Sequence, residues 1–303
     1  MKTLVTGGAG FIGSHLVDRL VKDGHQVTII DNLSTGFKKN INPRAKFVLA
    51  DIKNLAQIKK HFQGQDYVFH LAALSRVYPS IEDPLLANEN NIKGTLNVLL
   101  ASKKAQVKKV IYSASSACYG ANKPPLREDM LSDPDSPYAL SKYVGEEYCQ
   151  LFTKLYGLDT IILRYFNVYG SRTDPDGDYA TVIPIFLRQK ANGEPLTITG
   201  DGSKKRDFTY IDDVVEANIK AMRLKRKGNA EIINIGVGKN YTINQLAKMI
   251  GGKNIHIPAR PGEAKTTLAD NSKAWQILKW KPKIDLEEGI KRLIKTNEKK
   301  LNS

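Results

Sequence analysis

The first 165 residues alternate short apolar runs with longer stretches of helical pattern, and this alternation restricts the fold more than any other feature. The runs are rich in β-branched and aromatic residues, which is typical of strands buried on both faces. Strands that alternate with helices predict a parallel, doubly wound sheet with right-handed crossovers. The predicted strands are residues 3–6, 27–30, 47–49, 67–71, 110–113 and 160–164, and the predicted helices are residues 11–22, 54–62, 85–104 and 137–156.

In the second half of the chain the alternation gives way to shorter elements. Loops rich in Gly, Pro and Asp separate these elements, at residues 170–178, 200–203 and 259–263. We therefore expect a Rossmann-type α/β domain at residues 1–165 and a smaller α/β lobe at residues 166–303. A segment near 207–235, with a helix at 211–224, is expected to return to the main sheet. Only the tail at 295–303 is expected to be irregular.

The composition excludes several classes of protein. With 41% hydrophobic and 25% charged residues, the chain is neither disordered nor fibrous. No apolar run approaches the ~18 residues that a membrane span needs, and residues 1–8 predict a buried strand rather than a secretion signal. The two cysteines, Cys118 and Cys149, form no close-spaced pair, which fits a reducing compartment. We therefore expect a cytoplasmic protein without a membrane partner and, because the five histidines show no ligand spacing, without a metal.

The formal net charge of +15 would by itself suggest a nucleic-acid partner. However, the lysines are spread over the whole chain, commonly beside acidic residues. No basic segment carries interleaved aromatic residues of the kind that bind single strands. The charge therefore favours a basic surface around a site for an anionic small molecule, with no nucleic acid.

A glycine-rich turn follows the first predicted strand and opens the first predicted helix. Gly7, Gly10 and Gly13 permit a tight turn and a close approach of backbone to a pyrophosphate, and the helix N-terminus supplies free N–H groups. The second strand ends in Asp31, near the ~20-residue distance expected for the acid that binds ribose hydroxyls. Because a carboxylate there repels a 2′-phosphate, the pattern favours NAD over NADP.

A tyrosine and a lysine four residues apart are the best candidates for catalysis. Ser136 and Pro137 predict the start of a helix, so Tyr138 and Lys142 should lie on one face of its first turns. A nearby ammonium favours the phenolate and is expected to lower the pKa of Tyr138. Ser115 and Ser116 follow the strand at 110–113, and because the carboxyl ends of parallel strands face the ligand crevice, their hydroxyls can share the substrate's proton with Tyr138.

With these residues in hand, the chain resembles the extended short-chain dehydrogenase/reductase superfamily and, within it, the NAD-dependent nucleotide-sugar 4-epimerases of the UDP-galactose 4-epimerase type. The resemblance covers nearly the whole chain. The matching stretches are residues 6–16 (TGGAGFIGSHL), 31–36 (DNLSTG), 51–52, 70–73 (HLAA), Asn90, 164–170 (RYFNVYG), 200–202, 206–210 (RDFTY) and 260–263 (RPGE). Ser115, Tyr138 and Lys142 fall on the family's catalytic triad.

The resemblance also implies which residues bind the ligands. For NAD these are Gly7, Gly10, Phe11, Ile12, Gly13, Asp31, Asn32, Ser34, Thr35, Gly36, Asp51, Ile52, Leu71, Ala72, Ala73, Ser75, Asn90, Tyr138, Lys142 and Phe166. For the UDP-sugar these are Arg76, Ser115, Ser116, Tyr138, Asn167, Val182, Arg206, Arg260, Glu263 and Thr267. By the same resemblance, helices 85–104 and 137–156 pack with their copies in a homodimer.

The implied reaction is the interconversion of UDP-glucose and UDP-galactose through a 4-keto intermediate. In the family a bulky residue at the position of Thr267 excludes N-acetylated sugars, so the small Thr267 implies that the acetylated pair is also accepted. Other short-chain dehydrogenases that modify nucleotide sugars, such as a reductase or a UDP-glucuronate 4-epimerase, remain alternatives. A non-catalytic NAD-binding protein is a further one.

Overall fold

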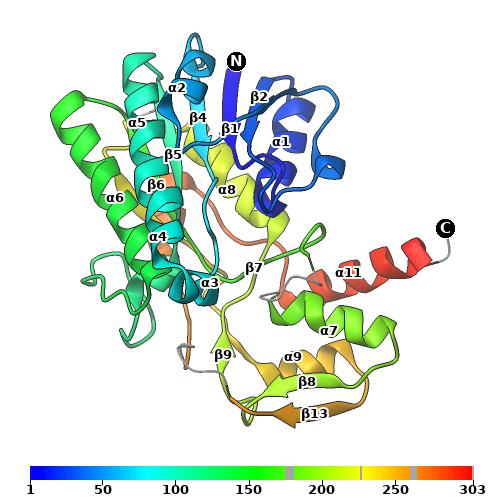
Figure 1. Cartoon of the computed structure of the whole chain (residues 1–303). Coiled ribbons are helices and arrows are strands. Elements are labelled where there is room, and N and C mark those ends of the chain that lie inside the picture. The colour runs from blue at the N-terminus through cyan, green and yellow to red at the C-terminus, as the bar shows by residue number, and fades with distance from the viewer. Residues whose placement is uncertain (175–180, 226, 260–264, 302–303) are drawn as a thin grey trace.

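The computed structural model describes residues 1–174, 181–225, 227–259 and 265–301. A seven-stranded sheet in the order β11-β6-β5-β4-β1-β2-β3 forms its centre, and all neighbouring strands are parallel (Figure 1). The strands are β1 (Lys2–Thr6), β2 (Gln26–Asp31), β3 (Lys46–Leu49), β4 (Tyr67–His70), β5 (Lys109–Ser115), β6 (Thr160–Tyr165) and β11 (Glu231–Ile235). The six predicted strands are confirmed, and so is the doubly wound Rossmann-type fold.

Helices cover both faces of this sheet. On one face α1 (Phe11–Lys22) packs against α8 (Ile211–Arg223), and on the other α5 (Gly94–Lys104) packs against α6 (Pro137–Tyr156). Neighbouring strand residues enter different cores: Val5 joins the cluster beneath α1 and α8, whereas Leu4 joins the cluster beneath α5 and α6. Burial on both faces explains why the strands are apolar without alternation.

The strand order reverses between β1 and β4. The chain runs outward through β1, β2 and β3 and then returns to β4 on the other side of β1, where Thr6 pairs with His70. A crevice forms at the carboxyl ends of strands at such a reversal, and ligands bind there in this class of fold. The structure thus places the glycine turn after β1 and the loop after β4 next to each other.

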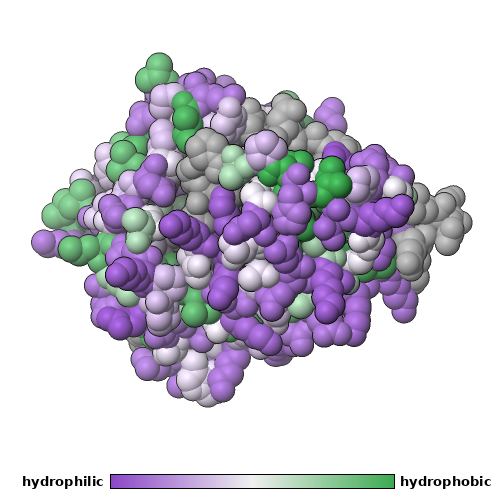
Figure 2. Space-filling model, turned by 90° about the horizontal axis from the view of Figure 1, so that it is seen from below, coloured by the Kyte–Doolittle hydropathy of each residue, from purple (hydrophilic) through white to green (hydrophobic). Residues whose placement is uncertain are grey.

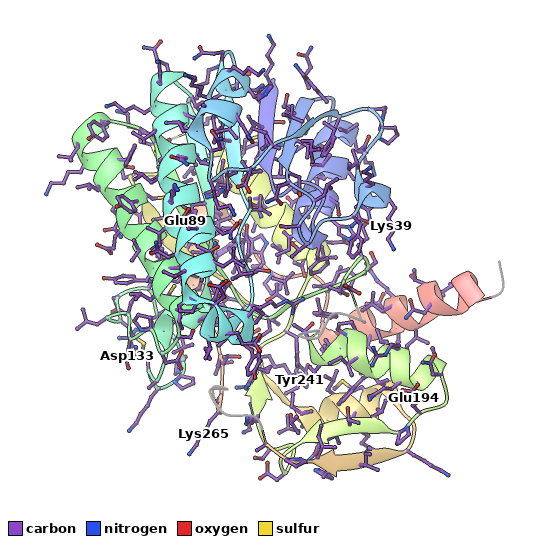
Figure 3. The ribbon with its side chains drawn as sticks, in the orientation of Figure 1. Lys39, Glu89, Asp133, Glu194, Tyr241 and Lys265 are labelled. Atoms are coloured by element: carbon purple, nitrogen blue, oxygen red, sulfur yellow. The ribbon has the colours of Figure 1, made fainter. Side chains whose placement is uncertain are left out.

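A smaller group of elements lies below the sheet in Figure 1. Its parts are α7 (Val182–Ala191), α9 (Ile243–Ile250) and the pairs β8 (Leu196–Thr199) with β13 (Asn254–Ile257), β7 (Val168–Tyr169) with β10 (Thr209–Tyr210), and β9 (Lys205–Arg206) with β12 (Tyr241–Thr242). The helix α10 (Ser272–Leu278) packs instead against β11 and α8. Tyr241 and Glu194 mark this lobe in Figure 3. Figure 2, which views the molecule from below, shows a largely hydrophilic surface.

Two predicted helices are wrong in detail. The segment expected to be one helix at 85–104 consists of α4 (Pro84–Ala87), a π-helical turn at Asn88–Lys93 and α5. The wide turn coincides with Asn91, whose side chain leaves the helix to bond the backbone of Leu74. The segment at 54–62 is α2 (Leu55–Ile58) followed by a 3-10 turn, Lys59–Phe62.

The tail expected to be irregular is also different, because α11 (Leu286–Leu301) continues through most of it. Glu287 pairs with Lys291 and Glu288 pairs with Arg292, each four residues apart. Such pairs with the acid on the N-terminal side stabilise a helix. Within the described parts of the chain, no helix combines the length and the apolarity needed to cross a membrane, and no group of three His, Cys, Asp or Glu side chains is placed to hold a metal.

Candidate active site

A cavity of about 1600 Å³ opens at the carboxyl ends of the strands, between the sheet and the lobe. Both halves of the chain contribute to its wall, and most of the predicted site residues lie on it. These are Gly7, Gly10, Phe11, Ile12, Gly13, Asp31, Asn32, Ser34, Thr35, Gly36, Ile52, Leu71, Ala72, Ala73, Ser75, Arg76, Asn90, Ser115, Ser116, Tyr138, Lys142, Asn167, Val182, Arg206 and Thr267.

Two predicted cofactor residues do not line this cavity. Asp51 is partly exposed, and its carboxylate accepts a hydrogen bond of 3.1 Å from Asn32, which does line the cavity. Phe166 is fully buried and packs beside Tyr119, with their ring centroids 6.2 Å apart. Arg260 and Glu263 lie outside the described residues.

The glycine turn leaves no room for side chains. A Cβ at Gly13 would lie 2.1 Å from the carbonyl oxygen of Gly7, and a Cβ at Gly7, where φ is +72°, would lie 2.7 Å from the backbone nitrogen of Ala72. Gly10 is the N-cap of α1 and brings no side chain to its first turn. The N–H groups and the positive end of the helix therefore face the cavity, and this cradle fits a pyrophosphate.

Asp31 is buried at the end of β2 and is fixed from two sides. Its Oδ2 accepts a hydrogen bond of 2.9 Å from the Ala9 N–H, and its Oδ1 accepts one of 2.8 Å from the Leu33 N–H. Each carboxylate oxygen keeps a further lone pair for the hydroxyls of a ribose. Since Asp31 bonds Ala9 within the glycine turn, the ribose and pyrophosphate positions are held together. The residues present fit NAD.

The local sequence places the candidate catalytic trio as predicted. Ser136 caps α6 by accepting a hydrogen bond of 3.2 Å from the Ala139 N–H, and Pro137 begins the helix. Tyr138 and Lys142 follow in the first two turns, and both face the cavity. Ser115 ends β5, and its side chain is hydrogen-bonded to that of Tyr138. The three side chains thus share one stretch of the cavity wall.

Burial, however, shifts the pKa of Tyr138 in the direction opposite to the one expected from the sequence. Loss of water raises the pKa of Tyr138 to about 12, and the hydrogen bond from Ser115 and the charge of Arg76 only partly oppose it. Burial also lowers the pKa of Lys142 to about 8. The prediction of a lowered tyrosine pKa is therefore wrong for the chain alone, because desolvation outweighs the nearby charges.

A buried polar network, missed by the sequence analysis, fixes the loop after β4. Asn91 accepts a hydrogen bond of 2.7 Å from the Leu74 N–H and donates bonds of 3.0 Å to the Leu74 carbonyl and 2.8 Å to Ser141. On the other side, Ser80 accepts a bond of 2.9 Å from the Tyr138 N–H. The available signal was the pair Asn90–Asn91 inside a helical segment, of which Asn90 lines the cavity and Asn91 holds the loop.

His70 continues this network beneath the crevice. Its Nδ1 lies 2.8 Å from the Thr6 hydroxyl and its Nε2 lies 2.9 Å from the Thr95 hydroxyl. Burial, and secondarily the charge of Lys142, lower the pKa of His70 to about 3. The ring is therefore neutral and holds β1 and α5 together rather than transferring protons.

On the lobe side, Asn167 and Thr267 form one corner of the cavity. The Asn167 amide donates hydrogen bonds of 3.0 Å to the Thr267 hydroxyl and 2.9 Å to the Asp207 carbonyl, and Asn167 has a positive φ of 33°. The buried Asp207 carboxyl accepts N–H groups of Val237, Gly238 and Ala269, while burial raises its pKa to about 6. These bonds anchor the corner to the loops around it.

Comparisons with known proteins agree with this geometry. Residues 3–236 match the model of the NAD dependent epimerase/dehydratase family. The structure of a UDP-glucose 4-epimerase from Thermotoga maritima with UDP-glucose is 41% identical, with a TM-score of 0.95, and the match covers 99% of this chain and 100% of that one. A UDP-N-acetylglucosamine 4-epimerase from Methanobrevibacter ruminantium M1 is also 41% identical, with a TM-score of 0.91 and coverage of 97% and 98%.

A third structure adds the cofactor. The UDP-glucuronic acid 4-epimerase from Bacillus cereus, in complex with UDP-glucuronic acid and NAD, is 36% identical, with a TM-score of 0.90 and coverage of 98% and 100%. Its fold therefore matches that of this chain over nearly the whole length. The chain belongs to the NAD dependent epimerase/dehydratase family, and its cofactor is NAD.

Proposed function

We propose that this chain is a UDP-hexose 4-epimerase that interconverts UDP-glucose and UDP-galactose, and also their N-acetylated counterparts. The observation that carries the proposal is one cavity wall shared by Ser115, Tyr138 and Lys142, beside the glycine cradle of Gly7–Gly13 and opposite the lobe. Such a wall places an acid–base group next to a hydride acceptor, which is what a transient oxidation needs.

The reaction begins with proton transfer at the sugar. Tyr138 takes the proton of the 4-hydroxyl, and Ser115 holds that hydroxyl in position. When bound, NAD would be held by the Gly7–Gly13 cradle and by Asp31, would supply the hydride acceptor for C4, and would favour the phenolate of Tyr138 through its positive charge. Lys142 holds the cofactor ribose, and Tyr138 returns the proton to the new 4-hydroxyl. No net oxidation product leaves.

The size of Thr267 supports the wider substrate range. Its side chain lines the cavity, and threonine is far smaller than an aromatic residue. An open pocket admits the smaller sugar with a modest loss, whereas a filled one excludes the larger sugar. We expect both plain and N-acetylated hexoses to be turned over.

The direct test is a product analysis. The protein is incubated with NAD and, separately, with UDP-glucose, UDP-N-acetylglucosamine and UDP-glucuronate, and the epimers are resolved by chromatography. The expected result is formation of UDP-galactose and UDP-N-acetylgalactosamine without accumulation of NADH. Accumulation of NADH in proportion to product would identify a net oxidoreductase instead, and NAD binding without turnover of any sugar would identify a binding protein.

We also propose that the chain forms a homodimer through the helices at residues 85–104 and 137–156. The outer sides of α4 and α6 carry Leu85 (78% exposed), Leu151 and Leu155 (58% exposed). Apolar side chains gathered on one surface mark an interaction site. Light scattering should give twice the mass of the chain, and a Leu151→Glu, Leu155→Glu double variant should be monomeric.

The compartment is a further proposal. Cys118 and Cys149 are buried and free. Thiols that remain unpaired fit a reducing compartment, so we propose the cytoplasm. Cell fractionation checks it.

A further inference from the structure

The ammonium of Lys142, which the proposed reaction uses, lies against the ring of a buried tyrosine that the reaction does not use. Tyr112 belongs to β5, and only 1% of its surface is exposed. The Nζ of Lys142 lies 4.7 Å from the centroid of the Tyr112 ring. Lys142 lines the cavity, whereas Tyr112 belongs to the core cluster beneath α5 and α6. Tyr112 can therefore act on the reaction through Lys142.

Three contacts fix the ring of Tyr112 relative to α6 and β4. Its hydroxyl donates a hydrogen bond of 3.3 Å to the carbonyl of Lys142. The same hydroxyl lies against Gly145 inside α6, where an added Cβ would clash with it. The ring of His70 packs beside it, with the two centroids 5.6 Å apart and the planes inclined by 42°. A glycine weakens the interior of a helix, so α6 carries one where a larger residue would displace the tyrosine.

The titratable groups around Lys142 leave its ammonium with little negative charge nearby. Those that face it from α6, from the 3-10 turn Ser116–Tyr119 and from β4 are Tyr138, Glu146, Cys149, Cys118 and His70. Glu146 is already paired with Arg164 at 2.6 Å, and burial keeps His70 neutral. Burial also raises the pKa of both thiols and of Tyr138, so these groups keep their protons.

The face of the Tyr112 ring is suited to such a cation. An aromatic face carries partial negative charge and attracts an ammonium within about 6 Å, most strongly where water is excluded. Burial raises the pKa of Tyr112 well above its usual value, so the phenol keeps its proton and the ring attracts the cation by its face alone. Because both partners are buried, this contact offsets part of the cost of removing the ammonium from water.

We propose that Tyr112 is a positioning residue, which holds the ammonium of Lys142 charged and in place with the face of its ring. This inference rests on the roles proposed above for Lys142 and Tyr138, and it adds a residue that does not itself line the cavity. Since the ring stabilises the charged form of Lys142, loss of the ring lowers the pKa of Lys142.

The first experiment measures the pH profile of kcat with UDP-glucose, on the NAD-loaded protein and three variants. Tyr112→Leu removes the aromatic face and should move the alkaline limb, where Lys142 loses its proton, to lower pH by about one unit. Tyr112→Phe keeps the face and should keep the limb in place. Phe152→Leu is the matched control, because it removes a buried ring from the same core cluster, where that ring packs against Tyr156.

A series of ring substitutions tests the face itself at nearly constant shape. Phenylalanines with one, two and three fluorine atoms are incorporated at position 112, and each fluorine withdraws electron density from the face of the ring. The alkaline limb should move to lower pH with each added fluorine. This series keeps the test decisive if Tyr112→Leu does not fold.

A second measurement needs no catalysis. Urea unfolding of the cofactor-free protein is compared with that of Lys142→Met across pH, in the Tyr112 background and in the Tyr112→Leu background. The pKa of Lys142 is about 8 in the fold, so its contribution to stability begins to rise near that pH in the unaltered protein. In the Tyr112→Leu background the rise should begin about one pH unit lower.

Each contrary outcome has its own meaning. If UDP-glucose is epimerised but the limb stays in place in Tyr112→Leu and in the fluorinated series, the inference is wrong while the proposed function stands. If Phe152→Leu moves the limb as far as Tyr112→Leu does, the shift reflects a loosened core, which also overturns the inference. If the unaltered protein epimerises no sugar, the proposed function fails, and the unfolding measurement decides whether Tyr112 holds the charge of Lys142.

Discussion

The amide of Asn167 donates a hydrogen bond of 3.0 Å to the hydroxyl of Thr267, a residue 100 positions later in the chain. The same hydroxyl accepts a bond of 3.1 Å from the Asp207 N–H. Thr267 therefore has two roles. Its small side chain lines the cavity, and its hydroxyl is hydrogen-bonded to Asn167, whose φ is positive. A substitution there changes both volume and hydrogen bonding, and the two effects must be separated.

Thr267→Tyr should lower turnover of UDP-N-acetylglucosamine at least tenfold more than turnover of UDP-galactose. The added ring fills the space of the acetamido group, whereas the plain sugar needs less room. Thr267→Val is the matched control, because it removes the hydroxyl at nearly constant volume. Thr267→Val should lower the free energy of unfolding by about 1 kcal/mol and leave the ratio of the two turnover rates unchanged. If Thr267→Tyr changes the turnover of both sugars equally, Thr267 does not limit the size of the sugar.

Tyr138→Phe should lower kcat by about 10²–10⁴-fold, because it removes the group that moves the proton. NAD affinity should change little, since the cradle at Gly7–Gly13 and the Asp31 carboxylate are untouched. Steady-state kinetics and calorimetric titration with NAD check the two parts. Normal turnover in this variant would show that another group carries the proton.

Lys142 should make the stability of the cofactor-free protein depend on pH. Its pKa falls from 10.5 when exposed to about 8 in the fold, so between these values the unfolded chain binds more protons than the native one. Stability relative to Lys142→Met should therefore rise from pH 8 to pH 10, by at most about 1.4 kcal/mol per pH unit. Urea unfolding of both proteins across this range measures the difference, in which the other titrating groups largely cancel. A flat or falling difference contradicts the assignment.

The sequence predicted the structure correctly where a position accepts only one residue or one class of residues. Strands buried on both faces leave unbroken apolar runs, so β1 could be predicted from Leu4 and Val5 alone. The glycine turn could be predicted because a Cβ at Gly13 meets the backbone. Asp31 could be predicted because its distance from that turn is nearly constant in such folds.

What failed depends on contacts between distant segments. The pKa of Tyr138 follows from its burial under parts of the chain that the local pattern does not mention. The π-helical turn at Asn88–Lys93 follows from a bond between Asn91 and Leu74 in another loop. Helical patterns in a sequence reflect only contacts between residues three or four positions apart. They therefore predicted one regular helix through the π-helical turn.

The neighbouring residues Asn91 and Asn90 should have different roles, the first in stability and the second in cofactor binding. Asn91→Ala removes the hydrogen bonds to the N–H and carbonyl of Leu74, and Ser141 keeps only its bond to the Tyr138 carbonyl, so we expect a loss of about 2–3 kcal/mol in the free energy of unfolding. The loop that carries Arg76 should also shift, which raises KM for the sugar. Asn90→Ala is the control, because Asn90 lines the cavity and, among the described residues, its side chain bonds only the Leu86 carbonyl, so it should weaken NAD binding at nearly unchanged stability. Thermal unfolding and NAD titration of both variants separate the roles, and equal stability of the two proteins would show that the network around Asn91 does not fix the site.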